Sequence, residues 1–328
     1  MAFVPERIAL VGGGNMGLRH GNFCQKLWPG APVAVLSRHC RPAAFPALAS
    51  PDALLHWNPS LAIVANAAID HCSSALPLLR AGIPTLIEKP LSHSAAVAAQ
   101  FLRALGDTLP APASVGFHLI HRRGFARLGR WLQEGILGKI FSVRTFQGHA
   151  LADWRPGDPT RSVSARERLG GGILREQCHD LALLSLLFGL PRSVLCRSWR
   201  VGSLSLAVAD SAQLILDLGG FPGEVHLDMV ALRPRRVWEI QGERGEIRWD
   251  LRADALDFFG RWERRSFVGR WDGCPSAYEL QLLDFAEKID RRDRTADALR
   301  RAGALCRLVD AAELSDREGR SISLEDAP

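Results

Sequence analysis

One segment near the N-terminus limits the possible folds of this chain more than any other feature. An almost uniformly apolar run from Arg7 to Val11 (RIALV) has the composition of a fully buried strand, since it does not alternate with polar residues. The turn GGGNMG follows it directly, and a helical pattern then continues to about Trp28. A buried strand, a glycine turn and a helix in this order predict the first unit of a doubly wound parallel sheet.

Short apolar runs continue to alternate with helical patterns up to about residue 120. The expected strands are residues 33–36, 61–65, 85–87 and 114–117. The helices between them begin at recognisable start signals, Ser50-Pro51-Asp52 and Ser94. This alternation predicts an N-terminal Rossmann domain over residues 1–120.

The pattern changes beyond residue 120, where we expect a C-terminal α+β domain over residues 121–328. The expected elements are a helix at 124–134, a strand at 140–146 and a helix at 172–188. Several strands with hairpin signals follow, and they predict an open, mostly antiparallel sheet. The polar segment 148–168 has no clear period. We expect it to be a functional loop, because so long a connection is unusual in a compact domain.

Composition and charge exclude several classes of partner. Of 328 residues, 47% are hydrophobic and 23% are charged, which suits a well-packed protein. The net charge is +6, but the densest basic cluster, at 291–301, contains no aromatic residue for base stacking, so we expect no nucleic-acid partner. No apolar run is long enough to span a membrane, and the chain enters its first strand too early for a signal peptide.

The cysteines indicate a reducing environment. There are seven of them, an odd number, and no two have the spacing of metal ligands. This pattern predicts free thiols, a cytoplasmic location and no metal site.

The glycine turn has the spacing Gly12-x-Gly14-x-x-Gly17, which in this context predicts a dinucleotide site. The first glycine permits the tight turn, the second lets the backbone approach a pyrophosphate, and the third lets helix and strand pack closely. The amides of Asn15 and Met16 would face the phosphates at the positive end of the helix. The alternative is a turn that is only structural.

Ser37 and Arg38 end the second expected strand, where enzymes that use NAD usually place an acidic residue for the ribose 2′-hydroxyl. A carboxylate would repel a 2′-phosphate, whereas Ser37 and Arg38 can donate hydrogen bonds to one. We therefore expect NADP as the cofactor, with NAD as the alternative. Arg38 would then only stack on the adenine, as it can with either cofactor.

The tripeptide Glu88-Lys89-Pro90 follows the expected strand at 85–87. The chain contains 41 Lys and Arg residues, and only four are lysines: Lys26, Lys89, Lys139 and Lys288. Arginine stays protonated, while lysine can be tuned by burial and neighbours into an acid or a base. The apolar flanks of Lys89 therefore indicate a functional lysine. The alternative is a surface lysine at a strand end.

Three motifs together resemble one family. They are the tripeptide at Glu88, the strand-end run IVANAAIDH (Ile63 to His71) and the glycine triplet Gly170 to Gly172. Over nearly its whole length the chain resembles the glucose–fructose oxidoreductase, inositol dehydrogenase and rhizopine-catabolism (Gfo/Idh/MocA) family. The stretches Asp153 to Gly189 and Leu227 to Asp250 are most similar to the branch found with surface-polysaccharide and nonulosonic-sugar genes.

The resemblance implies a function and a set of site residues. Members of the family transfer a hydride between NAD or NADP and a secondary alcohol or ketone of a sugar, cyclitol or sugar derivative. The site lies between a Rossmann domain and an α/β domain. The family lysine, here Lys89, works near the reacting hydroxyl and precedes a typically cis proline bond. Further implied cofactor contacts are Asn66, Ala67, His71 and Glu88, besides Lys89.

An acidic residue and a histidine follow the glycine triplet in the family, and here these would be Glu176 and His179. They are three residues apart within the expected helix at 172–188, so they would share one face. A carboxylate and an imidazole beside a nicotinamide can bind a sugar hydroxyl and carry its proton. We expect Lys89, His179 and Glu176 to be catalytic. The alternative is a capping or solvated Glu176 with His179 in the core.

The sequence departs from the family pattern around the expected substrate. His118 and Arg175 stand where members usually have asparagine and aspartate, and Trp154, Arg155 and Arg161 remain in the polar segment. We expect these five residues to bind the substrate, and the loop arginines would suit a carboxylate or phosphate on it. Salt bridges between loop and domain are an equal alternative for these arginines.

Two alternative functions and an oligomeric state are also expected from the sequence. The alternatives to a sugar oxidoreductase are a non-catalytic NADP-binding regulator and a glycosidase that uses bound NAD(P) within each turnover. Helices covering one sheet face only would leave an apolar face for a partner, with Val225, Leu227, Met229 and Trp238 as its expected residues. We expect a homodimer or homotetramer formed through the C-terminal sheet, as the resemblance also implies.

Overall fold

The computed structural model describes residues 3–37, 44–155 and 157–325 of the chain. The chain divides into two compact units, each built from two separate stretches of sequence. Residues 1–118 and 275–306 form the first unit, and residues 119–274 and 307–328 form the second.

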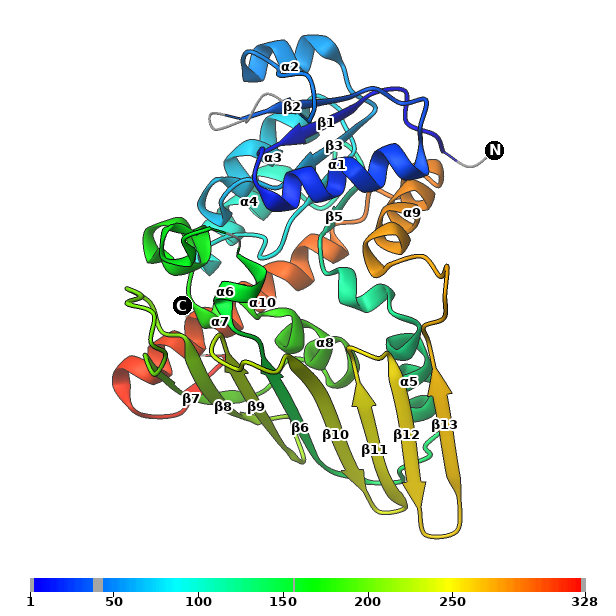
Figure 1. Ribbon diagram of the computed structural model, residues 1–328, viewed down its shortest axis with the longest axis vertical. Coiled ribbons are helices and arrows are strands. Elements are labelled where there is room, and N and C mark those ends of the chain that lie inside the picture. Colours follow the sequence, from blue (N-terminus) through cyan, green and yellow to red (C-terminus); the bar gives the residue numbers. More distant parts are fainter. Residues whose placement is uncertain (1–2, 38–43, 156, 326–328) are drawn as a thin grey trace. The chain divides into compact units, whose positions relative to one another are not determined.

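The first unit is built on a parallel sheet of five strands in the order β2-β1-β3-β4-β5 (Figure 1). The strands are β1 (Ile8–Val11), β2 (Val33–Leu36), β3 (Leu61–Val64), β4 (Thr85–Ile87) and β5 (Ala113–Val115). The helices are α1 (Asn15–Leu27), α2 (Pro51–Trp57), η1 (Ala68–Asp70), α3 (His71–Arg80), α4 (Ala95–Leu105) and α9 (Ala277–Asp290), with the first part of α10 (Asp297–Glu318). The chain adds β2 on one side of β1 and β3 on the other, which is the doubly wound arrangement predicted from the sequence.

Local sequence signals account for these elements. The hydroxyl of Ser50 accepts the N–H of Ala53 at 3.0 Å, and the hydroxyl of Ser94 accepts the N–H of Val97 at 3.4 Å, so both serines cap a helix as predicted. Strands β1 and β3 are buried at every residue. Their apolar residues therefore run on without alternation.

Helix α9 belongs to the first unit, although it follows the large sheet of the second unit in sequence. Its residues Leu282, Phe285 and Ala286 are buried in the same hydrophobic cluster as Ile8 and Leu10 of β1. The order of elements along the chain predicts that residues 275–306 belong to the C-terminal domain. No signal in the sequence indicates that this helix packs against the core of the first unit.

The second unit contains a sheet of nine strands in the order β13-β12-β11-β10-β6-β9-β8-β7-β14 (Figure 1). The strands are β6 (Ile140–Gly148), β7 (Ser193–Trp199), β8 (Ser211–Asp217), β9 (Pro222–Asp228), β10 (Arg235–Gly242), β11 (Gly245–Asp250), β12 (Ala255–Gly260), β13 (Arg264–Val268) and β14 (Ile322–Ser323). Strands β6 and β9 are parallel and the other neighbouring pairs are antiparallel. The predicted open, mostly antiparallel sheet is confirmed.

Helices of the second unit lie before, within and after this sheet in sequence. They are η2 (His118–His121), which begins at the border of the units, α5 (Arg123–Gln133), α6 (Leu151–Trp154), η3 (Pro159–Arg161), η4 (Val163–Ala165), η5 (Glu167–Leu169), α7 (Ile173–Glu176), α8 (His179–Phe188) and the last part of α10. The polar segment expected to be a loop is thus a series of short helical turns.

The four residues expected on the uncovered face of this sheet lie on its covered face. Val225, Leu227, Met229 and Trp238 are each at most 2% exposed, and the indole of Trp238 binds Asp180 of α8. The expectation was wrong for a physical reason. Alternation along a strand shows which side chains share a face, but it does not show which face the helices cover.

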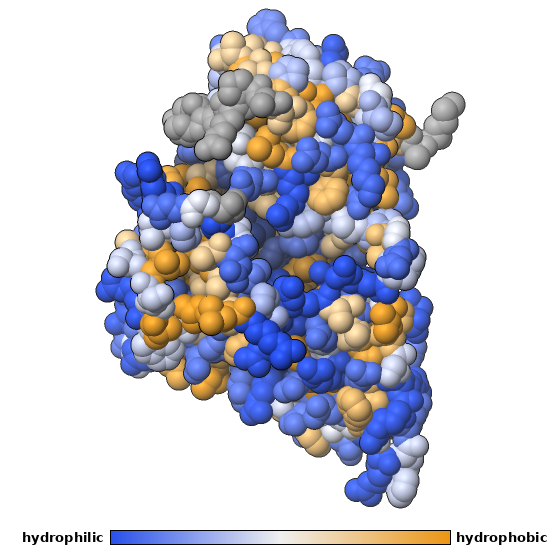
Figure 2. Space-filling view, in the orientation of Figure 1, coloured by the Kyte–Doolittle hydropathy of each residue, from blue (hydrophilic) through white to orange (hydrophobic). Residues whose placement is uncertain are grey.

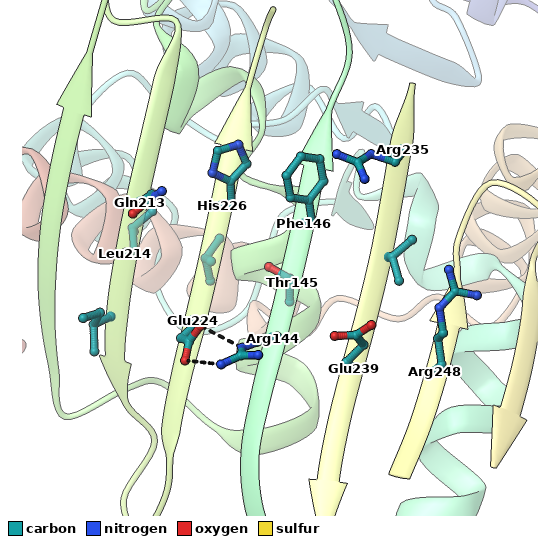
Figure 3. A pocket seen from close by; sticks show the side chains of 13 residues that line it. Arg144, Thr145, Phe146, Gln213, Leu214, Glu224, His226, Arg235, Glu239 and Arg248 are labelled. Carbon is teal, nitrogen blue, oxygen red and sulfur yellow. Dashed lines mark hydrogen bonds and ion pairs between the residues drawn. The ribbon is translucent and has the colours of Figure 1, made fainter. Parts of the chain in front are cut away.

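The opposite face of the sheet is open and mostly polar, and Figure 2 shows it largely in the hydrophilic colour. A groove of about 500 Å³ crosses β8, β9, β6 and β10 on this face (Figure 3). Within it, Arg144 pairs with Glu224 at 2.8 Å. The ring of Phe146 stacks on His226 with centroids 4.5 Å apart, and the guanidinium of Arg235 lies 4.3 Å from the Phe146 ring centre. The open face therefore carries charged and aromatic groups.

Three further findings concern the described part of the chain. None of the six described cysteines is in a disulfide bond. The described residues contain no cluster of three or more metal-ligating side chains. No helix among them combines the length and the apolar character needed to cross a membrane.

Candidate functional site

The cofactor residues predicted from the sequence lie along one edge of the first unit's sheet. Gly12 follows β1, Ser37 follows β2, Asn66 comes just after β3, and Glu88 follows β4. Because these strands are parallel, their carboxyl ends meet at the same edge, where doubly wound folds bind ligands. Arg38, the residue that most favours NADP, lies outside the described residues.

The space around the three glycines fits a bound dinucleotide. A Cβ on Gly12 would lie 2.6 Å from the backbone of Ala65 and Asn66, and Gly12 has a φ of +113° that other residues rarely adopt. A Cβ on Gly17 would lie 1.9 Å from the carbonyl oxygen of Gly12. A Cβ on Gly14, in contrast, would meet nothing within 4 Å. The turn is therefore closed toward the protein and open at Gly14, where the backbone would approach a pyrophosphate.

The start of α1 offers backbone donors beside this open space. Gly14 is the N-cap residue of α1, and no side chain caps the helix. The first amides of a helix, here including those of Asn15 and Met16, have no partner within the helix. They and the helix dipole suit a phosphate group at this place.

The segment after β3 is tied to the segment after β4 through His71. The ring Nδ1 of His71 lies 2.7 Å from the carbonyl oxygen of Pro90, and Nε2 lies 3.2 Å from that of Asn66. Burial lowers the pKa of His71. The side-chain amide of Asn66 donates to Ser74 at 2.8 Å, and Ala67 precedes η1. His71 thus holds two segments of the candidate cofactor edge together.

Glu88 is buried beside a histidine that sequence reasoning missed. The Nε2 of His20 lies 2.6 Å from Oε1 of Glu88, and the two side chains are 0% and 6% exposed. Burial by itself would raise the pKa of Glu88, but the hydrogen bond and charge of His20 and the charge of Lys89 outweigh it, so the pKa is lowered. His20 comes three residues after Gly17 on the same face of α1, and this spacing was the available signal.

Lys89 follows this pair directly. Its backbone N–H donates to Oε2 of Glu88 at 3.1 Å, and the Lys89–Pro90 peptide bond is cis, as the resemblance implied. The side chain of Lys89 is half-buried at the carboxyl edge. The buried Glu88 therefore holds the backbone that presents the lysine.

His118 lies in an aromatic stack of the first unit. Its ring and that of Tyr278, the chain's one tyrosine, are stacked with centroids 3.9 Å apart. Phe23 also stacks on Tyr278, at 5.6 Å. Burial raises the pKa of Tyr278, and the charge of Glu88 adds to this. That His118 binds substrate remains a prediction.

In the second unit, Glu176 and His179 do not belong to one continuous helix. Helix α7 ends at Glu176 and α8 begins at His179. Between them, Gln177 has φ −103° and ψ 22°, which is not helical. The expectation of one helix over 172–188 was therefore wrong at this point, and the two residues are not neighbours on a helix face.

Buried contacts hold the break between α7 and α8. The Nη2 of Arg236 donates to Gln177 Oε1 at 3.1 Å and lies 3.0 Å from Asp180 Oδ2. The indole N–H of Trp238 donates to Asp180 Oδ1 at 2.8 Å, and Asp180 is fully buried. Both sides of the Cys178-His179 pair are thus tied to β10. Sequence reasoning missed Asp180 and Arg236, although an acid beside the apolar run LALLSLLF must find a buried partner.

The loop residue Arg155 pairs with the candidate acid. Its Nη2 lies 3.4 Å from Glu176 Oε2, and its Nε donates to the hydroxyl of Ser164 at 3.0 Å. The guanidinium also lies 4.8 Å from the ring centre of Trp154, whose indole N–H donates to the carbonyl of His149 at 3.2 Å. Arg155 therefore makes the salt bridge between loop and domain that was one of its two alternatives.

The other two arginines differ in their surroundings. Arg175 contacts α10 through Glu313, at 2.7 Å, and Asp310, at 3.4 Å. Burial raises the pKa of Glu313, and the Arg175 charge opposes this. Arg161 is exposed on η3. The contacts of Arg175 suit a structural role. That Arg161 binds substrate remains a prediction.

Comparison with known proteins agrees with this architecture. Residues 125–248 match the family model of the GFO/IDH/MocA C-terminal domain. No curated protein matches the sequence. Among solved structures, levoglucosan dehydrogenase in complex with NADH and levoglucosan is 18% identical, covers 97% of this chain and 99% of its own, and has a TM-score of 0.83.

Two further structures share the fold. An inositol dehydrogenase homolog from Azotobacter vinelandii, complexed with NAD+, is 16% identical, with 98% of both chains covered and a TM-score of 0.80. An oxidoreductase from Agrobacterium radiobacter, in complex with NAD+, L-tartaric acid and magnesium, is 17% identical, with 97% and 98% covered and a TM-score of 0.78. The predicted fold is confirmed for the described residues, and the family resemblance is supported over residues 125–248.

Proposed function

We propose that the protein is an oxidoreductase that transfers a hydride between a nicotinamide dinucleotide and a secondary alcohol or ketone of a sugar, cyclitol or sugar derivative. The observation that carries this proposal is the carboxyl edge of the first unit, where the open glycine turn follows β1 and Lys89 comes shortly after β4 of the same parallel sheet. The names of two structures with the same fold support it, because they are a levoglucosan dehydrogenase in complex with NADH and an inositol dehydrogenase homolog complexed with NAD+.

Different residues of the chain would bind the cofactor and transfer the proton. Gly12, Gly14 and the first amides of α1 would hold the pyrophosphate, and the nicotinamide supplies a hydride acceptor or donor when bound. Loss of a hydride from a carbinol carbon requires loss of the hydroxyl proton as well, so a base must lie within hydrogen-bond reach of that hydroxyl. We assign this proton to Lys89, with His179 assisting and Glu176 orienting the substrate.

The proposal is tested by measuring reduction of NADP+ and NAD+ against a panel of sugars, polyols and sugar nucleotides. Turnover of at least one compound with a free secondary hydroxyl is expected. Binding of a dinucleotide without any turnover would favour the regulator instead. Release of a free sugar from a glycoside, with the dinucleotide unchanged at the end, would favour the glycosidase.

The cofactor is proposed to be NADP, because Ser37-Arg38 replaces the acidic residue that NAD enzymes place after the second strand. Replacing Arg38 with alanine should weaken NADP binding by roughly ten- to a hundredfold, the size of one lost charge-assisted contact, and should weaken NAD binding less. Titration of both reduced cofactors by nicotinamide fluorescence measures the two effects. Tighter binding of NAD than of NADP by the unmutated protein would contradict the assignment.

A homodimer or homotetramer through the open face of the nine-stranded sheet is also proposed. Ile215 lines the groove and is 55% exposed. Arg144, Glu224, Glu239 and Arg248, which Figure 3 labels, offer both signs of charge for a second copy. Light scattering should give a mass well above the 36.0 kDa of one chain. An Ile215→Asp variant should shift the protein toward the monomer. A monomer at micromolar concentration for the unmutated chain would exclude the proposal.

A further inference from the structure

The turn between β11 and β12, residues 251–254, brings together arginines from distant parts of the second unit. Arg252 belongs to the turn itself. The carbonyl of Arg236 accepts the N–H of Leu251 at 2.9 Å, and the Nη1 of Arg270 donates to the carbonyl of Arg252 at 2.9 Å. Three arginines from β10, the turn and the segment after β13 therefore meet at one end of the sheet.

A fourth arginine reaches the same turn from the start of α5. The N–H of Gly124 donates to Asp254 Oδ2 at 3.3 Å, which places Arg122, two residues earlier, beside the turn. Burial lowers the pKa of Arg122; the charge of Asp254 opposes this, while Arg270, Arg236 and Arg252 lower the pKa further. We call Arg122, Arg236, Arg252 and Arg270 the arginine cluster.

The carboxylates near the cluster are already engaged. Asp254 also accepts the indole N–H of Trp249 at 3.3 Å. Asp180 accepts that of Trp238 and is the ion-pair partner of Arg236. Asp250 accepts the backbone amides of residues 252 and 253, at 2.9 and 3.1 Å.

The arginines themselves are less completely paired. Among the described residues, no carboxylate lies within 4.0 Å of the guanidinium nitrogens of Arg122, Arg252 or Arg270. The Nε atoms of Arg122 and Arg236 are buried and have no hydrogen-bond acceptor in the described part of the chain. The charges of Arg236, Arg252 and Arg270 all act against the charge of Arg122, so a site of this kind favours an added anion.

The cluster adjoins the candidate substrate residues of the second unit. Through Gln177 and Asp180, Arg236 contacts the segment that carries His179. The ring of His149 lies next to that of Trp154. Burial lowers the pKa of His149, and the charge of Arg252 lowers this pKa further. Arg252 and Arg270 are exposed, so a ligand can reach them.

We propose that the arginine cluster binds a carboxylate or phosphate group of the substrate, which makes the substrate an anionic sugar derivative. Planar guanidinium groups bind both kinds of oxyanion through paired N–H donors. That the ligand is a sugar derivative rests on the proposed function. That the ligand carries a negative charge rests on the arginine cluster alone.

The test compares probes with and without one added carboxylate or phosphate group. D-glucuronate and D-glucose 6-phosphate are matched with D-glucose, and UDP-glucuronate with UDP-glucose. Binding is measured by isothermal titration calorimetry and turnover by reduction of the dinucleotide, at low and at physiological salt. At least one probe with the added carboxylate or phosphate should bind roughly tenfold or more tightly than its partner without that group, and added salt should reduce this preference.

The variants Arg252→Gln and Arg270→Gln, singly and together, should remove the preference while leaving the melting temperature nearly unchanged, because both side chains are exposed. Arg261→Gln is the matched control. Arg261 is an exposed arginine in the hairpin between β12 and β13, at the other end of the same strands. The control should keep the preference. The better of the carboxylate and phosphate probes identifies the anion.

The two proposals fail in different ways. Equal binding of each probe with the added carboxylate or phosphate and its partner without it, or a preference that survives the double variant, would overturn the arginine site even if a neutral sugar is oxidised. Tight binding of a charged probe that depends on Arg252 and Arg270, without turnover of any probe, would retain the arginine site and count against the oxidoreductase.

Discussion

Replacing Lys89 with methionine is expected to reduce turnover by about a hundredfold or more, the usual scale for a general acid–base group. Methionine keeps much of the length and apolar stem of lysine but cannot carry a proton. The variant should still fold and bind the dinucleotide, because Glu88 holds the segment through the backbone N–H of residue 89 rather than through the side chain. Single-turnover hydride transfer, on a substrate found by the screen, measures the loss.

Two companion variants separate the proton role from charge and position. Lys89→Arg should restore little activity, because a guanidinium does not give up its proton. His179→Ala should be milder and should act mainly on KM if His179 positions the substrate. Near-normal turnover in Lys89→Met would show that Lys89 does not carry the proton. The proton-transfer role would then be assigned to His179.

Replacing Gly17 with alanine is expected to weaken cofactor binding strongly and to remove much of the stability of the protein. Its Cβ would lie 1.9 Å from the carbonyl oxygen of Gly12, and backbone atoms cannot move aside as a side chain can. Overpacking of this kind costs about 3 kcal/mol or more, and the opened turn should weaken dinucleotide binding by roughly a hundredfold. Chemical denaturation and nicotinamide fluorescence measure the two losses.

Gly14→Ala separates the cofactor from the fold. Its Cβ meets no protein atom within 4 Å and the backbone is extended, with φ −77° and ψ −177°, so stability should change by no more than about 1 kcal/mol. Dinucleotide binding should nevertheless weaken by at least about tenfold if the open space holds the pyrophosphate.

Gly30→Ala is the control for both glycine variants, since its Cβ also meets nothing within 4 Å but lies away from the turn. It should change neither stability nor binding. Unaltered binding in Gly14→Ala would place the dinucleotide elsewhere.

Local sequence patterns determined much of this protein. The unbroken apolar residues of β1, the glycine spacing at Gly12 and the cap at Ser94 each act within one or two turns of chain, so they could be read without a structure. Parallel strands that alternate with helices then place Gly14 and Lys89 at one edge, because the carboxyl ends of such strands always meet there. The fold and the candidate cofactor residues were predictable for this reason.

Tertiary packing alone decided the remaining features. The covered face of the large sheet, the break between Glu176 and His179 and the contact of His20 with Glu88 depend on residues distant in sequence. The arginine cluster joins position 122 to position 270 through a turn at 251–254. Periodicity reports which side of its own strand or helix a residue faces. Periodicity carries no information on which distant element packs against that side. The packed element decides which charges and hydrogen-bond partners surround each buried group.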